Sequence, residues 1–239
     1  MTYTALEAVV FDFDGTLVDT EWPIFLGARA AMATFDVDLT DRVWAGVVGL
    51  SDGEGGWFDT LCARLEVDLA RSEFDVAYDA LRADDRSGSD PPAEPGALEL
   101  VRALERNGVP LAVASGSPVS WLEHHLERLG VRECFSALAG VDRVGGVGKP
   151  APDVYLLACA DLRVEPDRCV AIEDSVHGIV AAQAAGLTCV AVPSRITRHT
   201  DLSAADLVVD DLVALEPDLL AALVDGTTPG PVPNPVGLG

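Results

Sequence analysis

Residues 8–16 read AVVFDFDGT, an apolar run followed by two aspartates and a glycine. The apolar run predicts a buried strand that ends near Phe13. Side chains two residues apart in a strand point the same way, so Asp12 and Asp14 can face one site at the strand's carboxyl end. Two carboxylates this close repel each other unless Mg²⁺ or a lysine ammonium lies beside them. The stretch therefore predicts a charged site at the end of the first strand.

Lys149 is the only lysine of the chain, and every other member of its Lys and Arg total is arginine. It lies in a loop, in Gly148-Lys149-Pro150. A chain that otherwise uses arginine has a reason to keep a compact ammonium at one place. Taken alone the residue would be a solvated surface lysine, but its position among the other motifs favours a site residue.

The composition limits the partners that the chain can have. It has 239 residues, is 49% hydrophobic and carries a formal net charge of −23. This charge argues against nucleic acid and anionic lipid as partners. It also repels a phosphorylated substrate at long range, so any phosphate site must be locally positive. The acidity fits either salt adaptation or a GC-rich genome, and the sequence leaves both open.

No run approaches the ~18 apolar residues of a membrane span. No basic segment precedes an apolar one at the N-terminus, so no signal peptide is expected. The five cysteines are scattered without a CxxC pair and are typical of reduced thiols. We therefore expect a cytoplasmic protein without a membrane partner, and a monomer because no large apolar surface is evident.

From residue 97 onward, apolar runs alternate with helical patterns, which predicts a parallel sheet covered on both faces. The fold class expected is α/β, a Rossmann-like doubly wound sheet with an inserted helical cap. Strands are predicted at 6–13, 109–114, 138–140, 169–172, 188–192 and 207–209. Helices of this part are predicted at 97–106, 119–129, 153–160, 176–185 and 212–223.

Residues 19–90 show helical spacing and no convincing strand, with helices predicted at 22–35, 41–48, 58–65 and 72–81. A glycine-rich loop at 49–56 and a linker at 86–95 interrupt or end this region. We expect a helical cap at 19–90 and an α/β core made of 1–18 and 91–225. The Pro- and Gly-rich tail at 226–239 is predicted to be disordered.

Polar residues follow the predicted strands where each one ends. In open α/β sheets, ligands bind at the carboxyl ends of the strands, so these residues should meet. Carboxylates, hydroxyls and one ammonium together can hold Mg²⁺ and a phosphoryl group. The set consists of Asp12, Asp14, Ser115, Gly116, Ser117, Lys149, Glu173, Asp174 and Ser175.

These motifs, in this order, resemble the four motifs of the haloacid dehalogenase superfamily. The resemblance rests on Asp12-Phe-Asp-Gly-Thr16, Ser115, Gly148-Lys149-Pro150-Ala-Pro-Asp153 and Ile172-Glu-Asp-Ser175, and covers about residues 6–222. The helical segment between the first two motifs is similar to the small cap of the beta-phosphoglucomutase-like branch.

The resemblance implies a role for each motif residue. Asp12 would attack phosphorus and form an aspartyl-phosphate, and Asp14 would serve as acid and then as base. Mg²⁺ would be held by Asp12, the backbone carbonyl of Asp14, Asp174 and Glu173. Lys149 would offset the negative charge and orient Asp12.

The resemblance also implies a phosphate-binding group. Ser115 and backbone N–H groups near Phe13 and Gly116 would hold phosphate oxygens. Thr16 belongs to the same predicted group, since threonine at this place is common in phosphatases of the branch.

The function expected is a Mg²⁺-dependent phosphatase for a small metabolite, such as a sugar phosphate, a polyol phosphate or phosphoglycolate. Dehalogenases of the superfamily lack the second aspartate, so Asp14 favours phosphoryl chemistry. A phosphomutase is the first alternative. It is disfavoured because Ile24 stands where such mutases usually carry histidine, and because the 49–56 loop has no basic residue. A binding protein without catalysis is the alternative of another class.

Several neighbouring residues have simpler interpretations. Ser117 is predicted to cap the helix that follows it, and Asp174 or Ser175 the helix that starts near 176. His124 and His125 are expected on a helix surface rather than at a metal. Trp44 and Trp57 are expected in the core of the cap rather than against a substrate.

Overall fold

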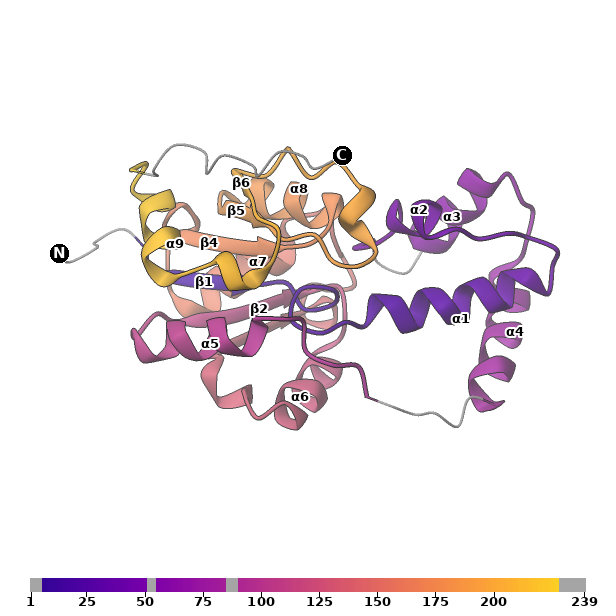
Figure 1. Cartoon of the computed structure of the whole chain (residues 1–239), viewed down its shortest axis with the longest axis horizontal. Coiled ribbons are helices and arrows are strands. Elements are labelled where there is room, and N and C mark those ends of the chain that lie inside the picture. The colour runs from indigo at the N-terminus through magenta and orange to yellow at the C-terminus, as the bar shows by residue number, and fades with distance from the viewer. Residues whose placement is uncertain (1–5, 51–54, 85–89, 228–239) are drawn as a thin grey trace, which may run out of the picture.

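The computed structural model describes residues 6–50, 55–84 and 90–227, with the backbone alone at 82–84. Its centre is a sheet of six strands in the order β3-β2-β1-β4-β5-β6, all paired in parallel (Figure 1). The predicted α/β class with a parallel sheet is therefore confirmed. The strands are β1 (Ala8–Phe11), β2 (Leu111–Ser115), β3 (Ala137–Gly140), β4 (Cys169–Glu173), β5 (Thr188–Ala191) and β6 (Leu207–Val208).

Helices cover both faces of this sheet, so every residue of β1, β2 and β4 is buried. Val9 and Phe11 pack on the same core as α5, α6 and α9, whereas Ala8 and Val10 pack with α7 and α8. Strands buried on both faces need continuous apolar residues, which the sequence provides. These helices are α5 (Ala97–Arg106), α6 (Val119–Arg128), α7 (Asp153–Leu162), α8 (Val176–Ala185) and α9 (Pro217–Val224).

Between β1 and α5, the described residues form four helices that lie together beside one end of the sheet (Figure 1). We call them the helical insert: α1 (Glu21–Ala33), α2 (Asp41–Ala45), α3 (Trp57–Leu65) and α4 (Arg71–Asp84). They bury a core of their own, in which Phe25, Trp44, Phe58 and Phe74 contribute aromatic rings. The helical insert thus holds itself together largely without the sheet, as the predicted cap would.

The chain enters and leaves the helical insert through two segments that lie side by side. Val18 and Ala93 form an antiparallel bridge. The N–H of Asp19 donates to the carbonyl of Pro92 at 2.9 Å, and that of Glu94 to the carbonyl of Leu17 at 3.0 Å. If the helical insert moves relative to the sheet, the backbone of these two connecting segments must bend.

The end of the chain differs from the sequence prediction of one helix over 212–223. The structure has a 3₁₀ turn at Leu212–Ala214 and then α9, which begins at Pro217. Proline lacks an N–H and suits the first turn of a helix, not its interior. The prediction of a continuous helix was therefore wrong, and the proline marks the new start.

Some predictions fall on residues outside the described ranges. They are the tail from residue 228 onward, residues 51–54 of the glycine-rich loop and residues 86–89 of the linker. Within the described part of the chain, no helix has both the length and the apolar character needed to cross a membrane.

Candidate active site

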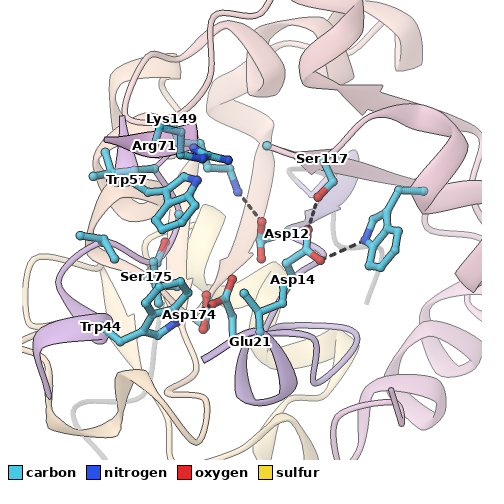
Figure 2. Close-up of a pocket in the computed structure, with 17 residues that line it drawn as sticks. Asp12, Asp14, Glu21, Trp44, Trp57, Arg71, Ser117, Lys149, Asp174 and Ser175 are labelled. Carbon is cyan, nitrogen blue, oxygen red and sulfur yellow. Dashed lines mark hydrogen bonds and ion pairs between the residues drawn. The ribbon is translucent and has the colours of Figure 1, made fainter. Parts of the chain in front are cut away.

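The carboxyl ends of β1 and β4 meet the loop before α7 at a buried group of ions. The Lys149 ammonium donates to Oδ1 of Asp12 and, at 2.5 Å, to Oε1 of Glu173 (Figure 2 shows the bond to Asp12). Lys149 is 3% exposed, Asp12 6% and Glu173 0%. The only lysine of the chain therefore lies between two carboxylates that water hardly reaches, as its isolation in the sequence suggested.

Glu173 accepts hydrogen bonds on both oxygens. Its Oε1 accepts from Lys149 and from the hydroxyl of Tyr155 at 2.7 Å. Its Oε2 accepts from the Ser175 hydroxyl at 3.1 Å and from the N–H groups of Asp174 and Ser175 at 3.1 and 3.2 Å. A carboxylate has about four lone-pair sites, so these donors leave little free. The contacts favour a role in holding Lys149, and metal binding by Glu173 stays a prediction.

Asp14 lies beside Asp12 and accepts four hydrogen bonds. Thr20 Oγ1 at 2.8 Å and Trp121 Nε1 at 3.2 Å donate to its Oδ1. Ser117 Oγ at 2.7 Å and Ser115 Oγ at 3.2 Å donate to its Oδ2. The predicted pair of aspartates is thus split: Asp12 faces Lys149, whereas Asp14 faces hydroxyls and an indole (Figure 2).

Asp174 completes a carboxylate cluster that could hold a metal. Oxygens of Asp12, Glu173 and Asp174 lie within 4.8 Å of one another. Asp174 is 1% exposed, and its Oδ2 accepts from the Thr197 hydroxyl at 3.4 Å. Carboxylate oxygens at this spacing are the ligands that Mg²⁺ prefers in proteins.

Burial makes this cluster electrostatically costly. It raises the pKa of Asp12 to about 7, with the charge of Glu173 acting in the same direction and Lys149 opposing it. Burial, with the charges of Asp12 and Glu173, holds the pKa of Asp174 well above its usual value. Three buried carboxylates share one ammonium, so a bound divalent cation would offset the remaining charge. The donor set therefore fits the predicted metal.

Burial would by itself lower the pKa of Lys149. The charges of Asp12 and Glu173 outweigh that effect, so the pKa is raised above its usual value. The ammonium consequently stays charged wherever the two carboxylates do.

A cavity lies between these carboxylates and the helical insert (Figure 2). The insert contributes Glu21, Ile24, Trp44, Trp57 and Arg71 to its lining. Trp44 Nε1 donates to Oε2 of Glu21 at 3.1 Å, and the Arg71 guanidinium lies 4.7 Å from the centre of the Trp57 ring. Burial raises the pKa of Glu21 to about 8, and the charge of Asp14 adds to this.

The two tryptophans lie in the core of the helical insert and also line the cavity. Trp44 is 4% exposed and lies in the core of the helical insert, and Trp57 packs against that core. Their rings are 5.5 Å apart, and both also line the cavity. The prediction of a cap-core position is confirmed, and the cavity contact is additional.

The predicted phosphate-binding residues lie close to Asp12, each in a different setting. Gly116 lines the cavity, whereas the Phe13 side chain is fully buried in the core. Thr16 is 1% exposed, and its hydroxyl has no hydrogen-bond partner among the described residues. Ser115 is fully buried, and its hydroxyl donates to Asp14 and accepts from the N–H of Ser117 at 2.9 Å.

Two neighbours differ from the predictions. Ser117 does not cap the next helix: α6 starts after Pro118, and the N–H of Val119 donates to Asp142 instead. The Ser117 hydroxyl donates to Asp14 instead, so the residue does lie with the predicted set of strand-end residues. His125 is 2% exposed and thus buried, not a surface residue, since its ring packs on Phe13 and on Trp121 of the same helix.

Ser175 caps α8 as predicted, because its hydroxyl accepts from the N–H of Gly178 at 3.1 Å. Thr20, Trp121 and Tyr155 were not predicted as site residues. None of the three belongs to a motif, and a single sequence offers no local signal for such contacts.

Comparison with known proteins places this geometry in a family. Residues 6–186 match the family model described as haloacid dehalogenase-like hydrolase. Hexitol phosphatase B of Escherichia coli K12 is 32% identical over 227 residues, covering 84% of this chain and 96% of the relative. Protein CbbY of Cereibacter sphaeroides is 32% identical over 225 residues, covering 88% and 94%. This chain also superposes on a crystal structure of CbbY from Rhodobacter sphaeroides in complex with phosphate, with a TM-score of 0.67 and 30% sequence identity. The match covers 88% of this chain and 96% of the CbbY chain.

Proposed function

The chain belongs to the haloacid dehalogenase-like hydrolases, and from this premise we propose how its site works. It is a phosphoric monoester hydrolase of that family. The proposal is a Mg²⁺-dependent phosphatase that acts on a small phosphorylated metabolite through an aspartyl-phosphate. One observation carries it: Lys149 binds one oxygen of Asp12, while Asp14 lies beside Asp12 under separate hydrogen bonds.

Asp12 is the proposed nucleophile. Lys149 donates to its Oδ1, whereas Oδ2 accepts no hydrogen bond from the described residues. Asp12 also lines the cavity, so this oxygen can meet a phosphorus atom there. As the bond from Asp12 to phosphorus forms, the bond from phosphorus to the leaving oxygen breaks. The second step returns Asp12 when water attacks the same phosphorus.

Asp14 is the proposed acid and base. Its carboxyl gives a proton to the leaving oxygen in the first step, and its carboxylate takes one from water in the second. The Ser115 hydroxyl has one proton, which it now donates to Asp14. If Ser115 donates to a phosphate oxygen instead, Asp14 loses one of its donors.

We assign the metal to Asp12, Asp174 and the backbone carbonyl of Asp14, with Glu173 as a further predicted ligand. The carboxylate spacing and the raised pKa of Asp174 support this assignment. When bound, Mg²⁺ would neutralise charge on the phosphoryl group and orient it.

The cavity favours hydrolysis over phosphoryl transfer between sugar hydroxyls. Ile24, which stands where mutases of the related branch usually carry histidine, lines the cavity and can neither give nor take a proton. The name of the relative hexitol phosphatase B supports a polyol or sugar phosphate as substrate. Phosphoglycolate and the mutase reaction remain the alternatives to be tested.

We also propose that residues 1–18 and 91–225 form the core and 19–90 a cap that closes the site. Support comes from the separate core of the helical insert and from the paired segments at Val18 and Ala93. Closure excludes water while the aspartyl-phosphate forms. The protein is proposed to act as a monomer.

Phosphate release from a panel of phosphorylated metabolites tests the function, with Mg²⁺ or with a chelator. We expect release from sugar or polyol phosphates that chelation abolishes. Asp12→Asn is the matched control, because it keeps the shape of the side chain and removes the nucleophile. Isomerised sugar phosphate without release would support the mutase. A protein that Mg²⁺ and phosphate stabilise without any turnover would support a binding protein.

A further inference from the structure

Three of the four donors to Asp14 differ in kind from the fourth. Thr20, Ser115 and Ser117 donate through hydroxyls, which rotate and can also accept hydrogen bonds. Trp121 donates through an indole N–H, which points in the plane of its ring and cannot accept. The direction of this one bond is therefore set by where the ring lies.

The Trp121 ring is held in place by the ring of His125. It packs edge-on against His125, with ring centres 4.3 Å apart. His125 is 2% exposed and also packs on Phe13, the residue between the two aspartates, with ring centres 6.1 Å apart. Trp121 itself lines the cavity beside Asp14. Helix α6 thus presents a fixed donor to the carboxylate of Asp14, in the segment that follows β1.

We propose that Trp121 is a positioning residue: by donating to Oδ1, it fixes the orientation from which the carboxyl group of Asp14 transfers a proton to the leaving oxygen. This inference rests on the proposed function of Asp14 as the acid. The hydroxyl donors can follow Asp14 if its carboxyl group turns, or leave it for a phosphate. The indole can do neither, so it fixes the orientation of the carboxyl group while the other partners exchange.

The inference predicts an effect that depends on the leaving group. An alkyl leaving oxygen must receive a proton as its bond to phosphorus breaks, and Asp14 supplies that proton. The 4-nitrophenolate of 4-nitrophenyl phosphate departs as an anion and needs none. A misplaced Asp14 therefore slows the first step for alkyl phosphates but hardly for this aryl phosphate. General acids contribute on the order of 10²–10⁴-fold, so partial misplacement should remain measurable.

The test compares kcat/KM for the alkyl phosphate that the wild-type protein hydrolyses fastest with kcat/KM for 4-nitrophenyl phosphate. The value of kcat/KM reflects the steps up to and including phosphoryl transfer to Asp12. It does not contain the second step, the hydrolysis of the aspartyl-phosphate, which is the same for both substrates. In Trp121→Phe, which keeps a ring against His125 but removes the N–H, we expect the alkyl value to fall about tenfold, the upper end of what one hydrogen bond to a neutral group contributes. The aryl value should change less than about twofold.

Two further variants calibrate the test. Asp14→Asn should show the same selectivity with a larger loss for the alkyl substrate. Trp44 also lines this cavity, but its indole N–H donates to Glu21 and not to Asp14. In Trp44→Phe, the ratio of the alkyl kcat/KM to the aryl kcat/KM should therefore stay within about twofold of the wild-type ratio.

Equal losses for both substrates in Trp121→Phe, or no loss for either, would overturn the inference. A Trp44→Phe variant that shifts the ratio as much as Trp121→Phe would also overturn it. Failure of the wild-type protein to hydrolyse any phosphate would instead contradict the proposed function, so the two failures are distinguishable.

Discussion

At the residue scale, the site depends on how one ammonium is shared. Lys149 is buried between Asp12 and Glu173, and Glu173 is in turn held by Tyr155 and by the start of α8. Taking these charges out of water is costly, and only mutual contact and full hydrogen bonding offset the cost. The arrangement leaves Asp12 oriented with one oxygen toward the cavity.

Lys149→Met tests this arrangement. Removing one partner of a buried ion pair leaves the carboxylates uncompensated, and we expect the free energy of unfolding to fall by about 3–5 kcal/mol. Urea unfolding measures the loss, and phosphate release should fall to background. Tyr155→Phe is the milder control. It removes one hydrogen bond to a charged group and should cost about 1.5–3 kcal/mol while the ion pair remains. Equal stability of the Lys149→Met variant and the wild type would contradict the account.

At the scale of elements, the helical insert touches the sheet edge next to the site. The backbone carbonyl of Val48 lies 2.9 Å from Nδ1 of His177, the second residue of α8. Arg195, in the loop after β5, lies 3.4 Å from the centre of the Trp22 ring in α1, and Ile196 joins the core of the insert. The insert therefore contacts α8 and the loop after β5 beside the carboxylate cluster, and the proposed closure would depend on these few contacts.

Gly49→Ala probes this closure. Gly49 has φ +82°, and a Cβ there would come within 2.5 Å of the Ser175 hydroxyl oxygen. We expect kcat/KM for phosphate esters to fall at least about tenfold, because the insert cannot approach the site as closely. Gly55→Ala is the matched control: its φ is +73°, but a Cβ would meet nothing described within 4 Å. Both variants should lose about 1–2 kcal/mol of stability from the left-handed backbone. A similar loss of kcat/KM in both would show that strain, not the contact, is responsible.

Glu94, in the segment by which the chain leaves the insert, makes the stability of the protein depend on pH. Burial raises its pKa to about 7, the charge of Asp19 adds to this, and its Oε1 is buried without a described partner. The folded state therefore binds this proton more tightly than the unfolded state. Through this group, stability is highest below the unfolded pKa of 4.5 and declines as the pH rises to about 7.

Glu94→Gln removes that dependence. Relative to wild type, the variant should gain stability progressively from pH 4.5 to about 7, and the difference should level off above that range. Urea unfolding at a series of pH values measures it. A difference that does not vary with pH would contradict a raised pKa at Glu94.

At the scale of the whole molecule, the net charge of −23 opposes any phosphorylated ligand. Positive charge at the site offsets this repulsion locally, where the phosphoryl group would lie. Lys149 provides one such charge, and a cation bound among the carboxylates would add another. Screening by salt weakens the long-range repulsion but acts less on buried charges.

Much of this architecture could be predicted from the sequence, because strand ends in a parallel sheet converge. For that reason the structure brings four predicted residues together at the carboxyl edge of the sheet: Asp12, Asp14, Lys149 and Asp174. The break before Pro217 was also readable but overlooked. The contacts of Trp121 and Tyr155 were not readable, because they depend on how α6 and α7 pack on the sheet, and no periodicity specifies that. The burial of His125 has the same cause.

The central claim is that Asp12 carries the phosphoryl group between the two steps. The most direct measurement is mass spectrometry of the protein after an acid quench during turnover of its best substrate. The account predicts a fraction of the wild-type protein that is heavier by one phosphoryl group, located in the peptide that contains Asp12, and none in Asp12→Asn. Phosphate release by the Asp12→Asn variant at the wild-type rate, or a phosphoryl group on another residue, would contradict it.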